Sequence, residues 1–177
     1  MTNIFRRSLI VTVAILFICG VTNPQTASSS KDLPNLFKVN EKLYRGGQPT
    51  EAGFKELRRM GIKTVIDLRD NDDRSRKEEA LAKAAGLRFI NIPLSNWFSP
   101  HNEDIKSILS EIDRRGDSPV YVHCKRGSDR TGTVIAVYRI THDGWTDKRT
   151  NEEAKKFGFG WWQVWMKHYI NDYVKTH

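Results

Sequence analysis

The chain has 177 residues, 38% of them hydrophobic and 28% charged, which suits one folded domain with a short extension and excludes wholesale disorder. Its net charge of +8 favours anionic partners, such as phosphorylated molecules or acidic lipid headgroups. Because the Lys and Arg residues are scattered rather than gathered in one run, we expect no nucleic-acid partner.

The N-terminal segment has the pattern of a secretory signal peptide. Arg6 and Arg7 precede an apolar run over residues 9–21, and a Ser-rich stretch follows at 28–30. The run is short for a membrane span, which needs about 20 apolar residues. We therefore predict that residues 1–29 hold a signal peptide and the start of a linker, with an uncleaved anchor as the alternative. The protein is then periplasmic or secreted, or contacts a membrane through this segment.

From residue 30 to residue 177 the sequence predicts a single domain in which strands and helices alternate. Strands are predicted at 37–44, 64–68, 88–92 and 120–123, and helices at 51–60, 73–85, 103–115, 130–142 and, as one or two pieces, 151–174. This alternation predicts a three-layer α/β sandwich with a mostly parallel central sheet.

Aromatic residues are concentrated near the C-terminus, at Trp161, Trp162, Trp165, Tyr169 and Tyr173. We expect them to pack against the domain, because large aromatic side chains are usually core residues. A partner-binding or membrane-surface role is the alternative.

The chemistry is predicted from the segment 120–132, which reads VYVHCKRGSDRTG. A buried strand ends at His123, and a helix opens near Arg130. Such a connection directs successive backbone N–H groups at one point, and the helix N-terminus adds positive potential. Gly127 permits the turn that this cradle needs. The predicted anion is a phosphate held by Lys125, Arg126, Gly127, Ser128, Asp129 and Arg130.

Cys124 is the predicted nucleophile of this loop. Backbone dipoles and the charges of Lys125, Arg126 and Arg130 favour its thiolate, which is the reactive form. Arg130 offers a planar fork of donors for two phosphoryl oxygens. Thr131 can donate its hydroxyl to the sulfur, and His123 is expected to orient the cysteine loop.

The run HCKRGSDRTG at 123–132 resembles the signature of the protein tyrosine phosphatase superfamily. The motifs LYRGGQP at 43–49, GIKTVIDLR at 61–69 and GLRFINIPL at 86–94 are similar to its bacterial dual-specificity-like branch. The resemblance implies a dual-specificity phosphatase-like fold, a phosphocysteine intermediate on Cys124 and water as the final acceptor. It implies no metal and no cofactor, a monomer, and a phosphorylated protein or a phosphoinositide as substrate.

The mechanism needs a general acid for the leaving oxygen. In the family this is usually an Asp on a separate loop, but here the corresponding positions carry Ser95 and Asn96. Asp129, inside the phosphate loop, is the acid that we favour. Asp104 and Glu103 are the alternatives, although acidic residues at a helix start are also ordinary first-turn residues.

Two other functions compete with the phosphatase. A non-catalytic phosphate-binding module would use the same cradle, and the missing acid at Ser95 and Asn96 favours it. A sulfur-transfer enzyme would also use a loop cysteine, but Arg130 and Thr131 favour phosphate. Trp97 and Phe98 would either stack on an aromatic or ring substrate, or pack in the core or as a lid.

Overall fold

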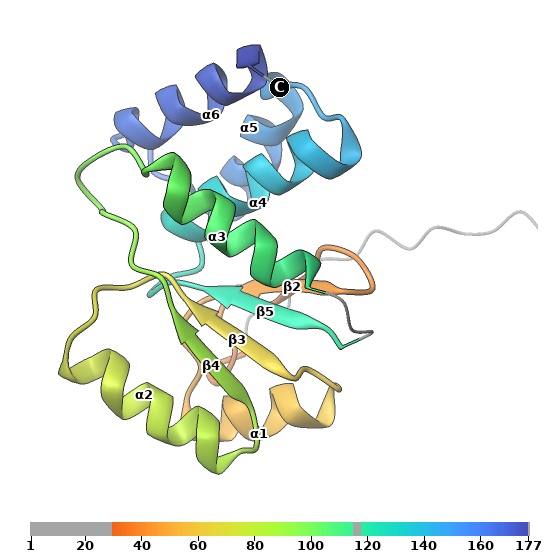
Figure 1. The fold of residues 1–177 in the computed structure, drawn as a ribbon, viewed down its shortest axis with the longest axis vertical. Coiled ribbons are helices and arrows are strands. Elements are labelled where there is room, and N and C mark those ends of the chain that lie inside the picture. Colours follow the sequence, from red (N-terminus) through yellow and green to blue (C-terminus); the bar gives the residue numbers. More distant parts are fainter. Residues whose placement is uncertain (1–29, 115–117, 177) are drawn as a thin grey trace, which may run out of the picture.

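The computed structural model describes residues 30–114 and 118–176, so the predicted signal peptide lies outside the described residues. The strands are β1 Phe37–Lys38, β2 Leu43–Gly46, β3 Thr64–Asp67, β4 Arg88–Asn91 and β5 Val120–His123. The helices are α1 Glu51–Arg59, α2 Asp73–Ala84, α3 Asn102–Asp113, α4 Asp129–Asp143, α5 Asp147–Lys156 and α6 Val164–Thr176. Figure 1 shows their arrangement.

The sheet has the order β1-β2-β5-β3-β4 and is parallel except for β1, which confirms the predicted mostly parallel sheet. β5 lies at its centre, between β2 and β3. The register pairs His123, at the end of β5, with Gly46 on one side and Asp67 on the other. Three strand ends therefore meet where the phosphate loop begins, as ligand sites in open α/β sheets require.

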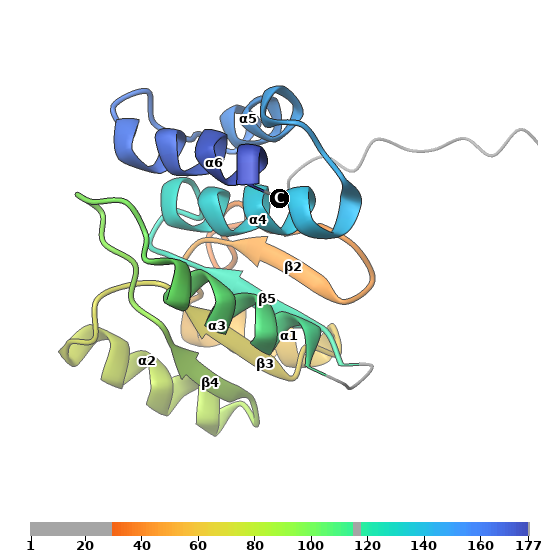
Figure 2. The same cartoon turned by 45° about the horizontal axis from the view of Figure 1, so that its top comes forward.

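Helices cover both faces of the sheet, which confirms the three-layer architecture. Phe54 and Leu57 of α1 and Ala82 of α2 fill the core on one face. Ile108 of α3 and Ile135 of α4 fill the core on the other face. Helices α5 and α6 pack on the outer side of α4 (Figure 2). No helix in the described part of the chain is long and apolar enough to cross a membrane.

The predicted first strand over 37–44 is wrong in extent, because a turn divides it into β1 and β2. The Asn40 side chain accepts a hydrogen bond from the Lys42 amide at 2.9 Å, and the amides of Val39 and Asn40 both donate to the Leu43 carbonyl. An Asn side chain that bonds its own backbone two residues on makes a turn without glycine. The segment therefore folds back as an antiparallel pair.

The expected packing of the C-terminal tryptophans is also wrong. Trp161, Trp162 and Trp165 are 87%, 50% and 56% exposed, whereas Tyr169 and Tyr173 pack partly against the core. Met166 and Ile170, one helical turn apart, fill the inner face of α6. The face of α6 that could bury Trp165 is therefore already occupied.

Candidate active site

The phosphate loop runs from Cys124 to Ser128, between β5 and α4. Cys124 is 3% exposed, and Gly127 has a φ of +73°. A Cβ atom on Gly127 would lie 2.4 Å from the carbonyl carbon of Gly46, so the loop packs directly on the backbone of β2. Only glycine fits both the left-handed conformation and this approach.

The carbonyl groups of the loop point away from its concave side. The oxygens of residues 125–127 accept hydrogen bonds, in order, from the Gln48 amide at 3.1 Å, the Asn35 side chain at 3.1 Å and the Arg45 guanidinium at 2.7 Å. The carbonyl and the N–H of a peptide unit point in opposite directions, so the following amides face the other side. Successive amides that converge in this way form an anion-binding nest.

Arg45 is the buried cation that holds this arrangement from behind. It is 1% exposed, and its guanidinium lies 3.9 Å from the ring centroid of Phe157. Burial lowers the pKa of Arg45 to about 10, so it remains charged at neutral pH. Its bond to the Gly127 carbonyl links the LYRGGQP segment to the phosphate loop.

The Cys124 thiol is activated by its surroundings. Burial is the largest influence and opposes ionisation. The hydrogen bonds from the Thr131 hydroxyl and amide, the Arg130 charge and the Gly127 amide outweigh it, so the pKa of Cys124 falls below its usual value. The buried Thr131 hydroxyl has no other hydrogen-bond partner among residues 30–114 and 118–176, which leaves it free for the sulfur. The predicted supporting role of Thr131 fits this geometry.

A buried charged network lies directly behind the cysteine. His123 is fully buried, and its Nε2 lies 2.9 Å from Glu78 Oε1, while its Nδ1 faces the Cys124 carbonyl at 3.2 Å. Burial alone would lower the pKa of His123, but Glu78 and Asp67 outweigh it and raise that pKa. His123 thus contacts the loop from below, in the position that its predicted supporting role requires.

Arg69 completes the network. It donates to both carboxylate oxygens of Asp67, at 2.9 Å each, and also pairs with Glu78. Asp67 and Arg69 lie in the GIKTVIDLR motif at 61–69, whereas Glu78 was not singled out from the sequence. The available signal was helical spacing, because Glu78 follows Ser75 by three residues and both are buried on one face of α2.

Asp67, Glu78 and His123 also have the spacing of a metal site, since their ligand atoms lie within 4.8 Å of one another. The Arg69 guanidinium, however, already engages both carboxylates. A metal cation there would face a fixed positive charge, so these residues fit an ion-pair network better than a metal centre.

A cavity of about 330 Å³ opens beside the loop. Its lining residues are Gln48, Arg69, Asp70, Asp72, Arg74, Asn96, Trp97, Lys125 and Arg130. Arg130 is oriented by the carbonyls of Leu68 and Leu94, both 3.4 Å from its Nη1. The loops after β3 and β4 therefore hold Arg130 at the mouth of the nest, where it can clasp phosphoryl oxygens.

Asp129 lies at the start of α4 and is buried. Its Oδ2 accepts from Arg126 at 2.5 Å and its Oδ1 from the Gly160 amide at 2.8 Å. The carboxylate thus ties the phosphate loop to the segment before α6. Asp104 and Glu103 lie in the first turn of α3, and neither lines the cavity with Arg130.

The remaining predicted residues divide between the nest and its rim. Ser128 is buried at the N-cap of α4, where its side chain makes no capping hydrogen bond. Lys125 and Arg126 are exposed at the mouth. Lys125 lines the cavity, whereas Arg126 turns to Asp129.

Comparison with known proteins places this geometry in a family. The model of the family described as "DSP-PTPase phosphatase fused to NAD+ Kinase" matches residues 20–163. The dual specificity protein phosphatase TpbA of Pseudomonas aeruginosa strain UCBPP-PA14 is 30% identical over 139 residues, which are 78% of this chain and 61% of TpbA. The chain thus spans about three fifths of that relative's length.

Solved structures of related phosphatases have a similar fold. The crystal structure of P. aeruginosa TpbA in complex with pTyr has a TM-score of 0.64 and 25% identity, covering 80% of this chain and 89% of that one. The core catalytic domain of the PP-IP phosphatase SIW14 from S. cerevisiae has a TM-score of 0.71 and 20% identity, covering 82% and 88%, and supports the fold alone. The chain therefore belongs to the bacterial dual-specificity-like branch of the protein tyrosine phosphatase superfamily.

Proposed function

We propose that the protein is a metal-independent cysteine phosphatase that hydrolyses phosphate monoesters. The observation that carries this proposal is the lowered pKa of Cys124 at the base of an amide nest, with Arg130 at its mouth. A nucleophile, an anion cradle and a transition-state cation are the parts that phosphoryl transfer to sulfur needs. The binding-module alternative does not require an activated thiol.

In the first step the Cys124 thiolate attacks phosphorus, and the bond from phosphorus to the leaving oxygen breaks. The leaving oxygen takes a proton from a carboxylic acid, and Arg130 and the loop amides hold the equatorial oxygens. In the second step water attacks the phosphocysteine, and inorganic phosphate and the thiolate are released. The Thr131 hydroxyl stabilises the departing thiolate.

Two carboxylates compete for the role of the acid. Asp129 remains the sequence prediction, but its two oxygens are engaged by Arg126 and Gly160, which favours a structural role. Asp70 is exposed and lines the cavity together with Arg130. Asp72 also lines it, but hydrogen bonds led by that from Arg74 lower the pKa of Asp72 to about 2, so it stays ionised. We favour Asp70 because of its position.

For the substrate, phosphotyrosine in a protein is the class that the relative TpbA supports, since TpbA has been crystallised with pTyr. Phosphoinositides are the second candidate, because Lys125 and Arg126 add positive charge beside the phosphate site.

We also propose that the protein is exported. This proposal depends only on Arg6, Arg7 and the apolar run at 9–21.

The test is hydrolysis of para-nitrophenyl phosphate in EDTA by wild type, Cys124→Ser and Cys19→Ser. Loss of the nucleophile should lower the rate by more than about 10³-fold. Cys19→Ser removes the only other thiol and should leave the rate unchanged. Vanadate should inhibit wild type. Vanadate binding without any hydrolysis would favour the binding module, and indifference to vanadate would favour sulfur transfer.

A further inference from the structure

Large hydrophobic residues are exposed mainly at one place on the molecule. Among the residues that the structure describes, seven such side chains are exposed: Leu81, Trp97, Phe98, Trp161, Trp162, Val164 and Trp165. Leu81 lies on α2, and the other six come from two short segments, 97–98 and 161–165. Exposed aromatic residues concentrated in this way mark an interaction surface.

The two segments are joined although they are more than 60 residues apart. Ser99 Oγ donates to the Trp165 carbonyl at 3.3 Å, and Gln163 Nε2 donates to Asn96 Oδ1 at 3.4 Å. Asp129 holds the Gly160 amide, which fixes the second segment to the phosphate loop. We call Trp97, Phe98, Trp161, Trp162 and Trp165 the aromatic rim.

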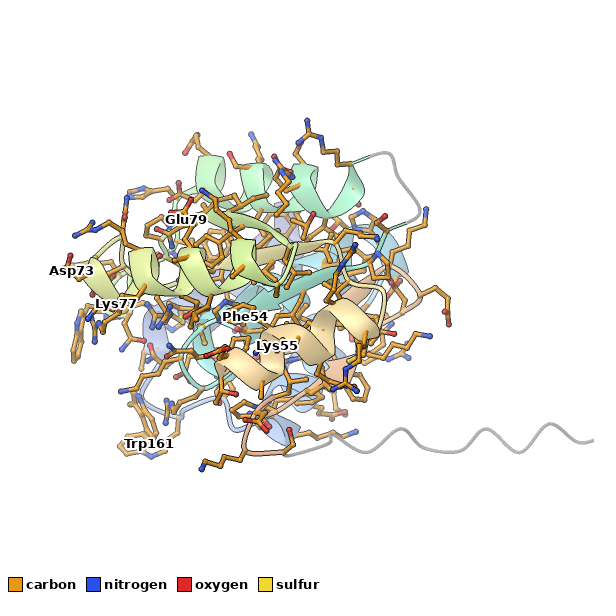
Figure 3. The ribbon with its side chains drawn as sticks, turned by 90° about the horizontal axis from the view of Figure 1, so that it is seen from below. Phe54, Lys55, Asp73, Lys77, Glu79 and Trp161 are labelled. Atoms are coloured by element: carbon orange, nitrogen blue, oxygen red, sulfur yellow. The ribbon has the colours of Figure 1, made fainter. Side chains whose placement is uncertain are left out.

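The aromatic rim projects from the protein rather than lining a groove. Trp97 and Phe98 are 75% and 71% exposed, and Trp161 is the most exposed of the set. Of these rim residues, only Trp97 belongs to the lining of the cavity beside the phosphate loop. Figure 3 shows Trp161 standing out at the same end of the molecule as Asp73, the first residue of α2. Aromatic anchors of protein interfaces normally fill pockets in a partner's groove, whereas indole rings projecting beside cations suit a lipid headgroup layer.

Positive charge accompanies the aromatic rim. The Arg126 guanidinium, which also pairs with Asp129, lies 5.7 Å from the ring centroid of Trp162. The exposed Lys125 lines the adjoining cavity, which Asp70 lines as well. The two acidic residues at the start of α2, Asp72 and Asp73, are paired with Arg74 and Arg76. Trp side chains favour the membrane–water interface, and Lys and Arg are attracted to anionic lipids.

We propose that the aromatic rim docks the domain on an anionic lipid bilayer. Because Trp97 belongs to both the rim and the cavity lining, docking turns the cavity beside the phosphate loop toward the membrane surface. The proposal does not depend on catalysis, since no rim residue supplies a reacting group. The Cys124→Ser protein should therefore dock as wild type does.

Tryptophan fluorescence of the full chain tests this directly. Four of the five tryptophans belong to the aromatic rim, and the fifth, Trp145, lies between Arg139 and Arg149 and is removed with Trp145→Phe. Residues 1–29 contain no Trp, so insertion of that segment alone gives no direct signal. We expect a blue shift, and quenching by brominated acyl chains, with vesicles of about 30% phosphatidylglycerol in phosphatidylcholine. Raising the salt to about 0.5 M should weaken both effects several-fold.

The variant Trp161→Ser/Trp165→Ser separates the rim from the N-terminal segment. Quenching of the remaining rim tryptophans should fall by about fivefold or more, while hydrolysis of soluble para-nitrophenyl phosphate stays unchanged. Leu81→Ser, which alters the exposed hydrophobic residue outside the rim, should behave as wild type. Undiminished quenching in the double variant would overturn the proposal, as would no quenching in wild type. A blue shift with a phosphotyrosine peptide but not with vesicles would assign the rim to a protein partner instead.

Discussion

The phosphate loop with its buried neighbours at 123–131, which we call the floor, and the exposed aromatic rim are built in opposite ways. On the floor, the carbonyls of residues 125–127 are bonded to fixed partners, and Thr131 and His123 are fully buried. In contrast, Trp97 and Phe98 of the aromatic rim are exposed, as is the nearby Lys125. We infer that the floor sets the chemistry at the phosphate, whereas the exposed rim selects the substrate that reaches it.

Of all the substitutions, a change at Gly127 should harm the protein most, because it disturbs the floor. Gly127→Ala would place a methyl group 2.4 Å from the backbone of Gly46 and strain a φ of +73°. The loop must then move, and with it the amides that hold phosphate. We expect the rate on every substrate to fall by more than about 100-fold, and the free energy of unfolding by roughly 3 kcal/mol.

Gly144→Ala is the matched control. Gly144 also has a positive φ, of +63°, but a Cβ atom there meets nothing within 4 Å. It should cost about 1 kcal/mol by thermal unfolding and leave kcat unchanged. Equal losses of activity in the two variants would show that backbone strain, and not the contact with Gly46, is what matters.

The next prediction distinguishes the role of Asp70, which lines the cavity, from that of Asp129, which is buried at the start of α4. We expect Asp70→Asn to lower kcat by about 100-fold for phenyl phosphate but much less for para-nitrophenyl phosphate, whose leaving group needs little protonation. Asp129→Asn should lower kcat for both substrates by the same factor. It should also lower the melting temperature, because it disturbs the contacts to Arg126 and Gly160.

Asp104→Asn serves as the control for the leaving-group test, since Asp104 is absent from the cavity lining. This variant should leave kcat unchanged for both substrates. A leaving-group dependence that follows Asp129→Asn instead of Asp70→Asn would restore the sequence prediction and require Arg126 to move away during turnover.

The floor could be predicted from the sequence because its chemical groups are contiguous. Residues 123–131 supply the nucleophile, the nest and the arginine, and a strand–loop–helix connection brings them together whatever surrounds it. The partners from other segments could not be predicted in the same way. Asn35, Arg45 and Glu78 meet the loop only through tertiary packing, and Glu78 lies in a helix whose charged sequence resembles a solvated face.

The rim was predicted poorly for a related physical reason. Aromatic composition shows that a segment can bury surface, but not which face of a short helix the core leaves free. In α6 the core takes Met166 and Ile170, so Trp165 is left outside.

The turn that divides β1 from β2 was not predicted, because it depends on an Asn side chain, which is a weaker turn signal than glycine.

A smaller effect is expected from the thiolate's own hydrogen bond. Thr131→Val removes the hydroxyl that helps to lower the pKa of Cys124, so that pKa should rise and iodoacetate should alkylate the thiol only at higher pH. The rate of hydrolysis at neutral pH should fall by about tenfold, as loss of one hydrogen bond to a charged group suggests.

Thr133→Val is the comparison for that test. Thr133 is also fully buried on α4, but its hydroxyl donates to the Asp129 carbonyl at 3.0 Å instead of facing the sulfur. Its alkylation profile should match that of wild type. If both variants shift the profile equally, a general loosening of α4 is responsible, and the specific role of Thr131 is wrong.

The smallest effect on rate, and the one that depends most on pH, concerns the charged network behind the floor. His123 has a raised pKa in the folded protein, so its pairing with Glu78 stabilises fully below the unfolded-state pKa of about 6.5 and is lost as pH rises through the folded-state pKa. Glu78→Gln should therefore lower the free energy of unfolding most at acidic pH, by roughly 2 kcal/mol or more. The deficit should shrink as the pH rises but not vanish, because the pairing with Arg69 is also weakened.

Denaturant titrations of Glu78→Gln between about pH 5 and pH 9 check this sign, because the ordinary pKa of a histidine lies in that window and that of an arginine lies far above it. Glu79→Gln is the neighbouring control, since Glu79 pairs with Lys83 in an exposed i, i+4 contact of 2.7 Å. Such a pair contributes well below 1 kcal/mol, so its loss should change stability little at any pH in this range. A deficit for Glu78→Gln that stays constant with pH would mean that Arg69, and not His123, is the partner that matters. In that case His123 would contribute to the floor through its shape and its contact with the Cys124 carbonyl rather than through its charge.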